Sequence, residues 1–242
     1  MTTFGWCGLD GFIRPDAIEM LAAEATTLLP QAQHLTITRN IYSEFPDRSL
    51  SASIPARREY THYPLQLADD QIPSQSLVKR LYYCDVLMDL VRQIEGKAKL
   101  FRSADEFQAL NIVALPPGEW HGWHYDQNEC TVTLLFQAPQ EAGEFTFIPN
   151  CRTPDHEDIE TVSRFLDGDM NVASTFGRSA GTFTLFRGES SLHGVTEVKG
   201  ERPRVTAIFT YDEQPNRRSG DEVNVRVYGP RVEQILEQRR EP

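Results

Sequence analysis

The chain has 242 residues, which is enough for one sizeable hydrophobic core without disulfide bonds. Its charged and hydrophobic fractions, 24% and 40%, are ordinary for a soluble globular protein. The formal net charge of −11 argues against a nucleic-acid-binding protein, which would present a basic surface. The same charge is compatible with a cationic small substrate.

Cysteine usage and the N-terminal sequence favour a cytoplasmic protein. Cysteines at positions 7, 84, 130 and 151 form no CxxC pair and no cluster, so we expect buried, reduced thiols. The opening sequence MTTFGWCGLDGF has neither the basic lead nor the apolar run of a signal peptide. No apolar segment approaches the length of a membrane span. The sequence does not indicate an oligomeric state.

The first hundred residues predict helices separated by a long polar segment. An apolar stripe with helical spacing predicts a helix between Pro15 and Pro30. Residues 31–73 are polar and interrupted by prolines, so we assign little regular structure there and interpret the segment as a lid or binding loop. A second helix is predicted from Ser74 or Ser76 to Glu95, with Gly96 at the C′ position.

From Leu110 onward the pattern changes to short segments rich in β-branched and aromatic residues, bounded by glycine, proline and asparagine. The predicted strands are Asn111–Leu115, Thr131–Gln137, Glu144–Ile148, Thr182–Phe186, Val205–Tyr211 and, near the C-terminus, Val223–Tyr228. Helices are predicted at Glu157–Leu166 and around Val232–Arg239.

Helices followed by many short strands predict a mainly β protein with flanking helices, in which a jelly-roll core fits the pattern best. We expect one domain over residues 1–242. Within it, residues 1–100 would provide helical support and the lid loop, residues 101–230 the jelly-roll core, and residues 231–242 a C-terminal helix.

The segment LPPGEWHGWHYDQNECTVTLLFQAP contains a candidate metal site. On an extended strand residues i and i+2 share a face, so His124 and Asp126 would project together while Tyr125 turns away. A second histidine would complete the 2-His-1-carboxylate set, which leaves open coordination positions on Fe(II). We favour His193, which follows the strand TFTLFRG.

The position of His193 depends on how the neighbouring strands pair. If Thr182–Phe186 and Val205–Tyr211 are adjacent, His193 lies on or beside their connection at one rim of the roll. Enough chain separates it from Asp126 for several strands to return it to the first pair of ligands.

A candidate carboxylate receptor follows His193 in the sequence. Arg204 opens an apolar strand, and Thr206 shares its face. A guanidinium group beside a hydroxyl can bind both oxygens of a buried carboxylate and resists deprotonation. Arg202 is the alternative, but Pro203 separates it from the strand.

Together, HxD, a distal histidine and Arg-x-Thr resemble the Fe(II)/2-oxoglutarate-dependent dioxygenases. The segments GWHYDQNECTVTLLFQ, GEFTFIPNCR and LFRGESSLHGVTEVKGERPR are similar to the subgroup of free-amino-acid halogenases and related lysine hydroxylases. The resemblance implies a double-stranded β-helix (cupin-like) core and O2 as oxidant. It also implies Fe(II) on His124, Asp126 and His193, with 2-oxoglutarate chelating the iron and its distal carboxylate on Arg204 and Thr206.

One departure from the subgroup bears on the reaction. In its halogenases a small residue replaces the carboxylate ligand and leaves a coordination position for chloride. This chain keeps Asp126, so the resemblance implies hydroxylation. The expected substrate is a small polar metabolite, in particular a free amino acid or derivative, and the acidic net charge favours a cationic one.

Several residues are candidates for contact with the substrate. They are Arg58, with Arg152 as the alternative, for a substrate carboxylate, and His121, Gln127, Thr210 and Tyr228 around the metal site. Two other functions remain open: a hydroxylase of the same fold acting on a nucleotide or peptide-bound residue, and a jelly-roll metal-binding module without turnover. A zinc hydrolase is disfavoured because no general base stands near the HxD strand.

Overall fold

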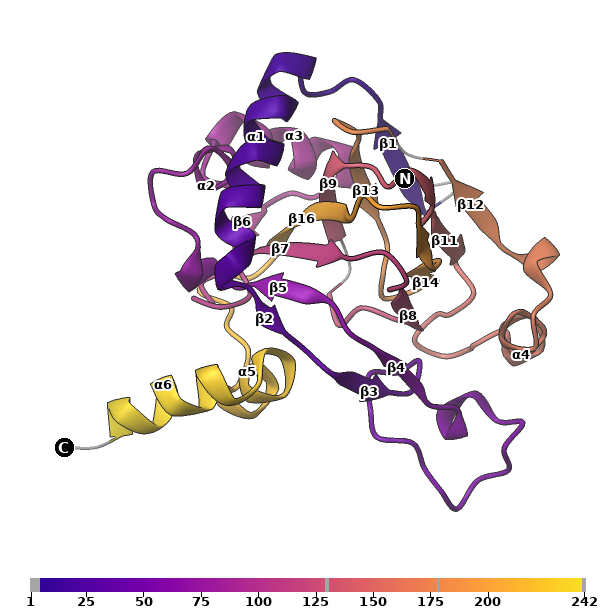
Figure 1. Ribbon diagram of the computed structural model, residues 1–242. Helices are drawn as coiled ribbons and strands as arrows, with labels where there is room; N and C mark the ends of the chain where they lie inside the picture. The colour runs from indigo at the N-terminus through magenta and orange to yellow at the C-terminus, as the bar shows by residue number, and fades with distance from the viewer. Residues whose placement is uncertain (1–4, 129–130, 178, 241–242) are drawn as a thin grey trace.

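Two antiparallel β-sheets form the core of the computed structural model, which describes residues 5–128, 131–177 and 179–240 (Figure 1). The major sheet contains, in spatial order, β1 (Trp6–Leu9), β13 (Phe183–Phe186), β9 (Thr131–Gln137), β16 (Arg204–Asp212), β7 (Leu110–Leu115), β5 (Leu65–Leu67) and β2 (Gln33–His34), with β6 (Phe101–Arg102) paired to β16. The minor sheet contains β12 (Ser174–Phe176), β11 (Phe145–Ile148), β14 (Leu192–Val195) and β8 (His121–His124). Smaller ladders join β3 (Ile37–Arg39) to β4 (Tyr60–His62) and β10 (Glu141–Ala142) to β15 (Val198–Lys199).

This arrangement confirms the predicted mainly β, jelly-roll architecture. The five strands predicted between residues 111 and 211 are all present, each within one residue of its expected ends. Strands β1, β2 and β5 extend the major sheet. Because β2, β3, β4 and β5 all lie within residues 31–73, that segment holds more regular structure than the sequence indicated.

Each face of the major sheet has its own packing partner. Helices α1 (Pro15–Leu28), α2 (Leu77–Tyr82) and α3 (Asp85–Glu95) pack on one face, in the same apolar cluster as Ile112, Leu134 and Phe209. The other face meets the minor sheet through a smaller, aromatic-rich cluster that includes Phe145 and Phe186. Because side chains alternate along a strand, Val205, Ala207 and Phe209 of β16 face the helices while the intervening residues face the minor sheet.

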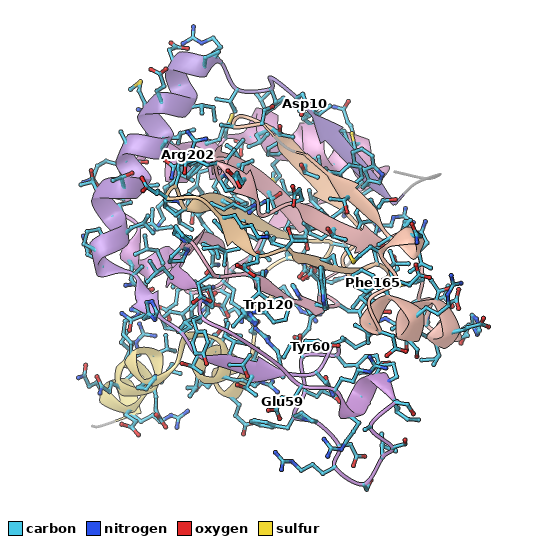
Figure 2. The ribbon with its side chains drawn as sticks, turned by 45° about the vertical axis from the view of Figure 1, so that its right-hand side comes forward. Asp10, Glu59, Tyr60, Trp120, Phe165 and Arg202 are labelled. Carbon is cyan, nitrogen blue, oxygen red and sulfur yellow. The ribbon has the colours of Figure 1, made fainter. Side chains whose placement is uncertain are left out.

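Two segments flank the minor sheet. Asp158 is the N-cap of helix α4 (Ile159–Leu166), and its carboxylate accepts a hydrogen bond from the backbone N–H of Thr161 at 3.0 Å. Its Phe165 meets Trp123 of β8 edge to face, with ring centroids 4.8 Å apart. The β3–β4 hairpin packs beside β8 through Tyr60 and Trp120, both marked in Figure 2. Short 3-10 helices cover Leu29–Gln31, Pro55–Arg57, Asp69–Gln71 and Met170–Val172.

The prediction of one helix ending at Glu95 is wrong, because the segment forms two helices, α2 and α3. The chain becomes extended at Cys84, with φ −71° and ψ 116°. The apolar positions Leu81 and Leu87 are six residues apart, a spacing that one continuous helix cannot place on one face. The break resolves this conflict, since Leu87 is buried and Leu81 packs, partly buried, against the same apolar cluster.

The predicted strand Val223–Tyr228 is also wrong, because the segment belongs to helix α5 (Asp221–Tyr228). Its alternating valines resemble a strand, but the buried residues are Asn224 and Tyr228, four apart and hence on one helical face. Both make tertiary hydrogen bonds, and these outweigh the local β-propensity. Helix α6 (Pro230–Arg240) follows, as expected, and lies beside α5 at the C-terminus (Figure 1).

Two further sequence predictions concern cysteines and membrane segments. Cys7, Cys84 and Cys151 are free thiols, as expected, but only Cys151 is buried. Cys130 lies outside the described residues. The described helices include none whose length and hydropathy would suit a membrane span.

A buried carboxylate anchors α5 to the core. Asp105 is 4% exposed and accepts hydrogen bonds from the backbone N–H groups of Phe107, Gln108 and Ser219 and from the Asn224 amide, at 2.9 to 3.0 Å. Four donors therefore depend on one side chain.

We expect Asp105→Ala to lower the free energy of unfolding by about 3 kcal/mol, because buried donors lose a charged acceptor. Urea denaturation measures this loss, and faster hydrogen exchange in α5 would accompany it. The exposed Asp155→Ala is the control, with little expected effect. A loss below about 1 kcal/mol for Asp105→Ala would contradict the anchoring role.

Candidate active site

Three side chains suited to metal binding converge where β14 pairs with β8. His193 on β14 lies opposite His124 at the end of β8, and Asp126 follows two residues later. The Nε2 atoms of His124 and His193 lie 3.5 Å and 3.6 Å from the Asp126 carboxylate. The expected adjacency of Thr182–Phe186 (β13) and Val205–Tyr211 (β16) is wrong, because β9 lies between these two strands. His193 therefore does not lie on a connection between adjacent strands but on β14 of the minor sheet.

Backbone carbonyl groups fix both imidazole rings. His124 Nδ1 lies 2.7 Å from the Gly122 carbonyl oxygen, and His193 Nδ1 lies 2.9 Å from that of Ser191. Since a carbonyl oxygen only accepts hydrogen bonds, each Nδ1 carries the proton. Each Nε2 is therefore unprotonated, and its lone pair can bind a metal ion between the three side chains. Burial, followed by the nearby His193, lowers the pKa of His124, which favours the neutral ring that a metal requires.

Asp126 is held in one orientation by two neighbours, Gly188 and Thr131. Its backbone N–H donates to the Gly188 carbonyl at 3.0 Å, and its carboxylate accepts from the Thr131 hydroxyl. Gly188 lies so close to this carboxylate that a Cβ atom there would overlap it. Burial alone would raise the pKa of Asp126, but the adjacent His193 and His124 hold it well below its ordinary range. The carboxyl group is therefore ionised at neutral pH.

The donor set fits a divalent transition metal. Two imidazole nitrogens and one carboxylate oxygen lie within 4.8 Å of one another. They line a cavity of about 240 Å³ between the two sheets. Three ligands facing an open cavity are the arrangement that leaves positions for further ligands on Fe(II).

A buried cation stands on the opposite wall of the same cavity. Arg204 and Thr206 are 5% and 4% exposed, and the guanidinium group donates to the threonine hydroxyl. Arg204 forms no ion pair with any carboxylate of the described residues. Burial lowers its pKa to about 10, so it stays charged at neutral pH. A buried charge without a counterion is costly, so this wall is suited to an anionic ligand.

The alternative arginine, Arg202, lies elsewhere. It is exposed and donates to the Pro139 carbonyl at 3.4 Å. Of the two candidates, only Arg204 faces the cavity.

The other predicted contacts divide into two groups. His121, Gln127, Thr210 and Tyr228 line the cavity. Arg58 does not, since its guanidinium group pairs with Asp167 at 2.8 Å. Arg152 is also absent from the cavity wall, because it donates to the Glu189 carbonyl and stacks on the Tyr125 ring.

Several other cavity residues were not indicated by the sequence. They are the amides Gln66, Gln108, Asn111 and Asn128, and the arginines Arg39 and Arg226. Asn111 carried the clearest signal, as the one strongly polar residue in the strand LNIVAL. Its Oδ1 accepts from Tyr228 and Gln66, at 2.9 Å and 2.8 Å, and thereby joins α5 and β5 to β7.

Comparison with known proteins identifies the family. The model of the halogenase D family matches residues 1–224, which is most of the chain. The chain belongs to the halogenase D family. This membership confirms the predicted relation to the halogenase-containing subgroup of Fe(II)/2-oxoglutarate-dependent dioxygenases. No curated protein matches the chain in sequence.

Solved structures share the fold of this halogenase D family member at low identity. AviO1 from Streptomyces viridochromogenes Tue57 is 16% identical with a TM-score of 0.60, over 88% of this chain and 90% of that one. HygX from Streptomyces hygroscopicus, with nickel and 2-oxoglutarate bound, is 14% identical with a TM-score of 0.59, over 88% and 85%. EctD from S. alaskensis, with 2-oxoglutarate and 5-hydroxyectoine, is 19% identical with a TM-score of 0.57, over 88% and 75%.

We expect Gly188→Ala to weaken metal binding about tenfold or more, because the added methyl group would displace the Asp126 carboxylate. Anaerobic Fe(II) titration in competition with a chelator measures the affinity. Gly177→Ala is the matched control, since no atom lies within 4 Å of the methyl group it would add. Equal affinities in the two variants would show that Gly188 does not position the carboxylate.

Proposed function

We propose that the protein is an Fe(II)- and 2-oxoglutarate-dependent hydroxylase of a small polar metabolite, such as a free amino acid or derivative. Hydroxylation would be coupled to decarboxylation of 2-oxoglutarate to succinate. One observation carries the proposal: the histidine–aspartate–histidine group and the unpaired, buried Arg204 face the same cavity. A metal-binding module without turnover has no use for that second feature.

In this proposal His124, Asp126 and His193 hold Fe(II) through two Nε2 atoms and a carboxylate oxygen. Arg204 and Thr206 bind the distal carboxylate of 2-oxoglutarate, the guanidinium group supplying charge and the hydroxyl a further hydrogen bond. Iron and 2-oxoglutarate, when bound, supply the chemistry that inserts one oxygen atom of O2 into a C–H bond. Apolar wall residues such as Phe145, Phe186 and Val195 exclude water beside the metal ligands.

The retained carboxylate favours hydroxylation over halogenation, despite the family's name. Asp126 is ionised and fixed by Thr131 and Gly188, so it is preorganised as a third protein ligand. A halide would have to compete with it for a coordination position.

Cavity size and composition support a small polar substrate. About 240 Å³ beside the metal group suits a metabolite better than a peptide strand or a base-paired nucleotide. His121, Gln127, Thr210 and Tyr228 would contact it on the walls. EctD, a neighbour in fold, was solved with 5-hydroxyectoine, a small hydroxylated molecule.

We further propose that residues 1–242 form a single dioxygenase domain, which acts in the cytoplasm.

We expect Arg204→Ala to weaken 2-oxoglutarate binding about 100-fold while Fe(II) affinity stays nearly unchanged, because a buried charge pair is lost away from the metal. The visible charge-transfer band of the chelated oxoacid, titrated anaerobically, reports the first quantity. Arg202→Ala is the control, since this arginine is exposed. Equal loss of iron and 2-oxoglutarate affinity would show that Arg204 acts on the fold instead.

The reaction itself is tested by incubating the enzyme with Fe(II), 2-oxoglutarate and a panel of small metabolites. The expected result is succinate formation together with a product heavier by about 16 mass units, the mass of one oxygen atom. A product that gains chlorine when chloride is supplied would replace hydroxylation with halogenation. Succinate without product for every candidate, at the rate of the substrate-free enzyme, would count against the substrate class.

A further inference from the structure

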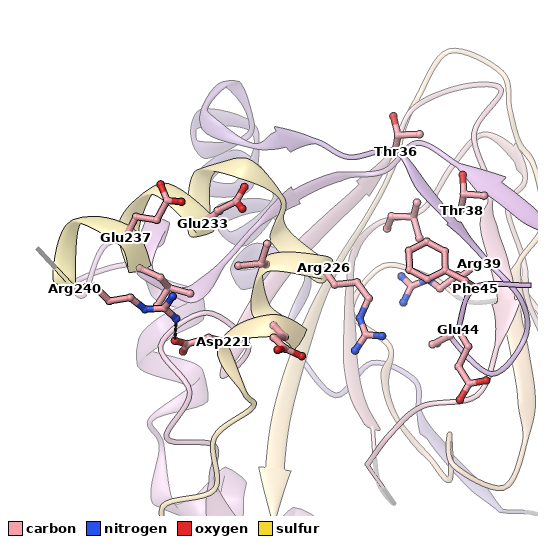
Figure 3. A pocket seen from close by; sticks show the side chains of 15 residues that line it. Thr36, Thr38, Arg39, Glu44, Phe45, Asp221, Arg226, Glu233, Glu237 and Arg240 are labelled. Atoms are coloured by element: carbon pink, nitrogen blue, oxygen red, sulfur yellow. Dashed lines mark hydrogen bonds and ion pairs between the residues drawn. The ribbon is translucent and has the colours of Figure 1, made fainter.

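Two arginines that the proposed chemistry does not use meet at the entrance of the metal cavity. Arg39 belongs to β3 and Arg226 to α5, so elements far apart in the sequence bring them together. Both residues line the metal cavity and also a larger outer cavity of about 630 Å³ between the β3–β4 hairpin and the C-terminal helices. Figure 3 shows Arg226 reaching from α5 toward the side of the pocket where Arg39 lies. The pair therefore stands on the wall between the two cavities.

Neither guanidinium group forms a hydrogen bond or ion pair within the part of the chain that the structure describes. Burial lowers the pKa of Arg39, and the positive charge of Arg226 lowers it further, whereas the charge of Asp126 raises it. These effects place Arg39 within electrostatic range of both Arg226 and the metal group. Arg39 is partly buried, whereas Arg226 is exposed. Two cations that repel each other are stabilised when an anion lies between them.

The acidic residues nearby do not supply that anion. Asp221 of the outer cavity pairs with Arg240 at 2.7 Å. Four glutamates also line the outer cavity, and within the described part of the chain none forms an ion pair with either arginine; they are Glu44, Glu222, Glu233 and Glu237. Among the described residues of the metal cavity the single carboxylate is Asp126, which belongs to the metal group. Inside the metal cavity a substrate ammonium group would therefore find amides and arginines, but no acid besides the metal-group Asp126, since the glutamates line only the outer cavity.

We propose that Arg39 and Arg226 form an anion clamp, and that the substrate is a small organic anion whose carboxylate or phosphate group binds between them. The clamp deepens the hydroxylase function proposed above and rests on it. Planar guanidinium groups bind either anion through paired hydrogen bonds. With the charged group held at the entrance, the rest of the molecule extends past the amides toward the metal ligands. The acidic net charge of the chain favours a cation, whereas the cavity walls favour an anion.

Binding of matched ligands tests the clamp. The enzyme with Fe(II) and 2-oxoglutarate is titrated anaerobically with four ligands of similar size that each carry one terminal group, butyrate, propyl phosphate, butyramide and butylamine, and perturbation of the visible band is followed. We expect the two anions to bind at least tenfold more tightly than the neutral and cationic ligands. The tighter of the two anions identifies a carboxylate or a phosphate substrate. Preferential binding of butylamine or butyramide would overturn the clamp.

The variants Arg39→Gln and Arg226→Gln should each weaken anion binding about tenfold or more, while the band of the iron–2-oxoglutarate complex is unchanged. Arg240→Gln is the matched control, because this arginine lines the outer cavity alone. Full anion affinity in the double variant would overturn the proposal. Loss of the visible band in the wild-type protein would instead defeat the hydroxylase function, so the two failures are distinguishable.

Thermal unfolding with inorganic phosphate gives a second test, which does not depend on the choice of organic ligand. With 2-oxoglutarate saturating Arg204, phosphate should raise the melting temperature of the wild-type protein and leave that of the double variant unchanged. At low salt without phosphate, each single variant should melt no lower than wild type, because substitution relieves repulsion between the arginines. An equal response of wild type and double variant to phosphate would overturn the clamp.

Discussion

The active site depends on the pairing of β14 with β8. This ladder sets His193 opposite His124, and the chain reaches Asp126 immediately after β8 ends. A shift of one residue in register would turn the His193 ring to the other face of the sheet, and the three side chains would no longer converge. Gly194 permits the close approach, because a Cβ atom there would overlap the ring of Trp123 and the backbone of His121. The metal site is thus a consequence of strand register and of a missing side chain.

The second requirement is that polar residues occupy one face of the strand β16. Arg204, Thr206 and Thr210 alternate with residues buried under the helices, so one strand serves both the core and the cavity. Burying the Arg204 guanidinium group without a carboxylate costs stability in the free protein. The large apolar cluster on the opposite face offsets that cost and keeps the strand rigid. Stability and function are therefore coupled through alternate residues of the same element.

The sequence predicted the parts of the fold that local patterns determine. Strands with strong β-propensity, such as Thr131–Gln137, were placed to within a residue. The HxD spacing and a distal histidine after a glycine-bounded strand named the three side chains that the structure brings within 4.8 Å of one another. The errors arose where tertiary contacts override local preference. The sequence of helix α5 predicts a strand, but its Asn224 and Tyr228 form hydrogen bonds with Asp105 and Asn111, which lie far away in the sequence.

Substrate contacts were the least predictable part of the site, for the same reason. Arg58 was an obvious candidate in a polar loop, yet Asp167 of a distant segment neutralises it. Arg39 lies in an unremarkable segment, ITR, and becomes a candidate only because helix α5 places Arg226 on the same cavity wall. Whether an arginine is paired or free depends on residues far away in the chain, and no local pattern contains that information.

The net charge of the whole chain and the local charge of the cavity wall differ in sign. At physiological ionic strength charges are screened beyond about 8 Å, so exposed acids across the surface contribute little inside a half-enclosed cavity. There the nearby guanidinium groups dominate, because low surrounding polarisability strengthens short-range interactions. The surface can thus carry an excess of acid, which favours solubility, while the cavity wall remains cationic. Substrate charge follows from the few groups within contact distance, and composition is a poor guide to it.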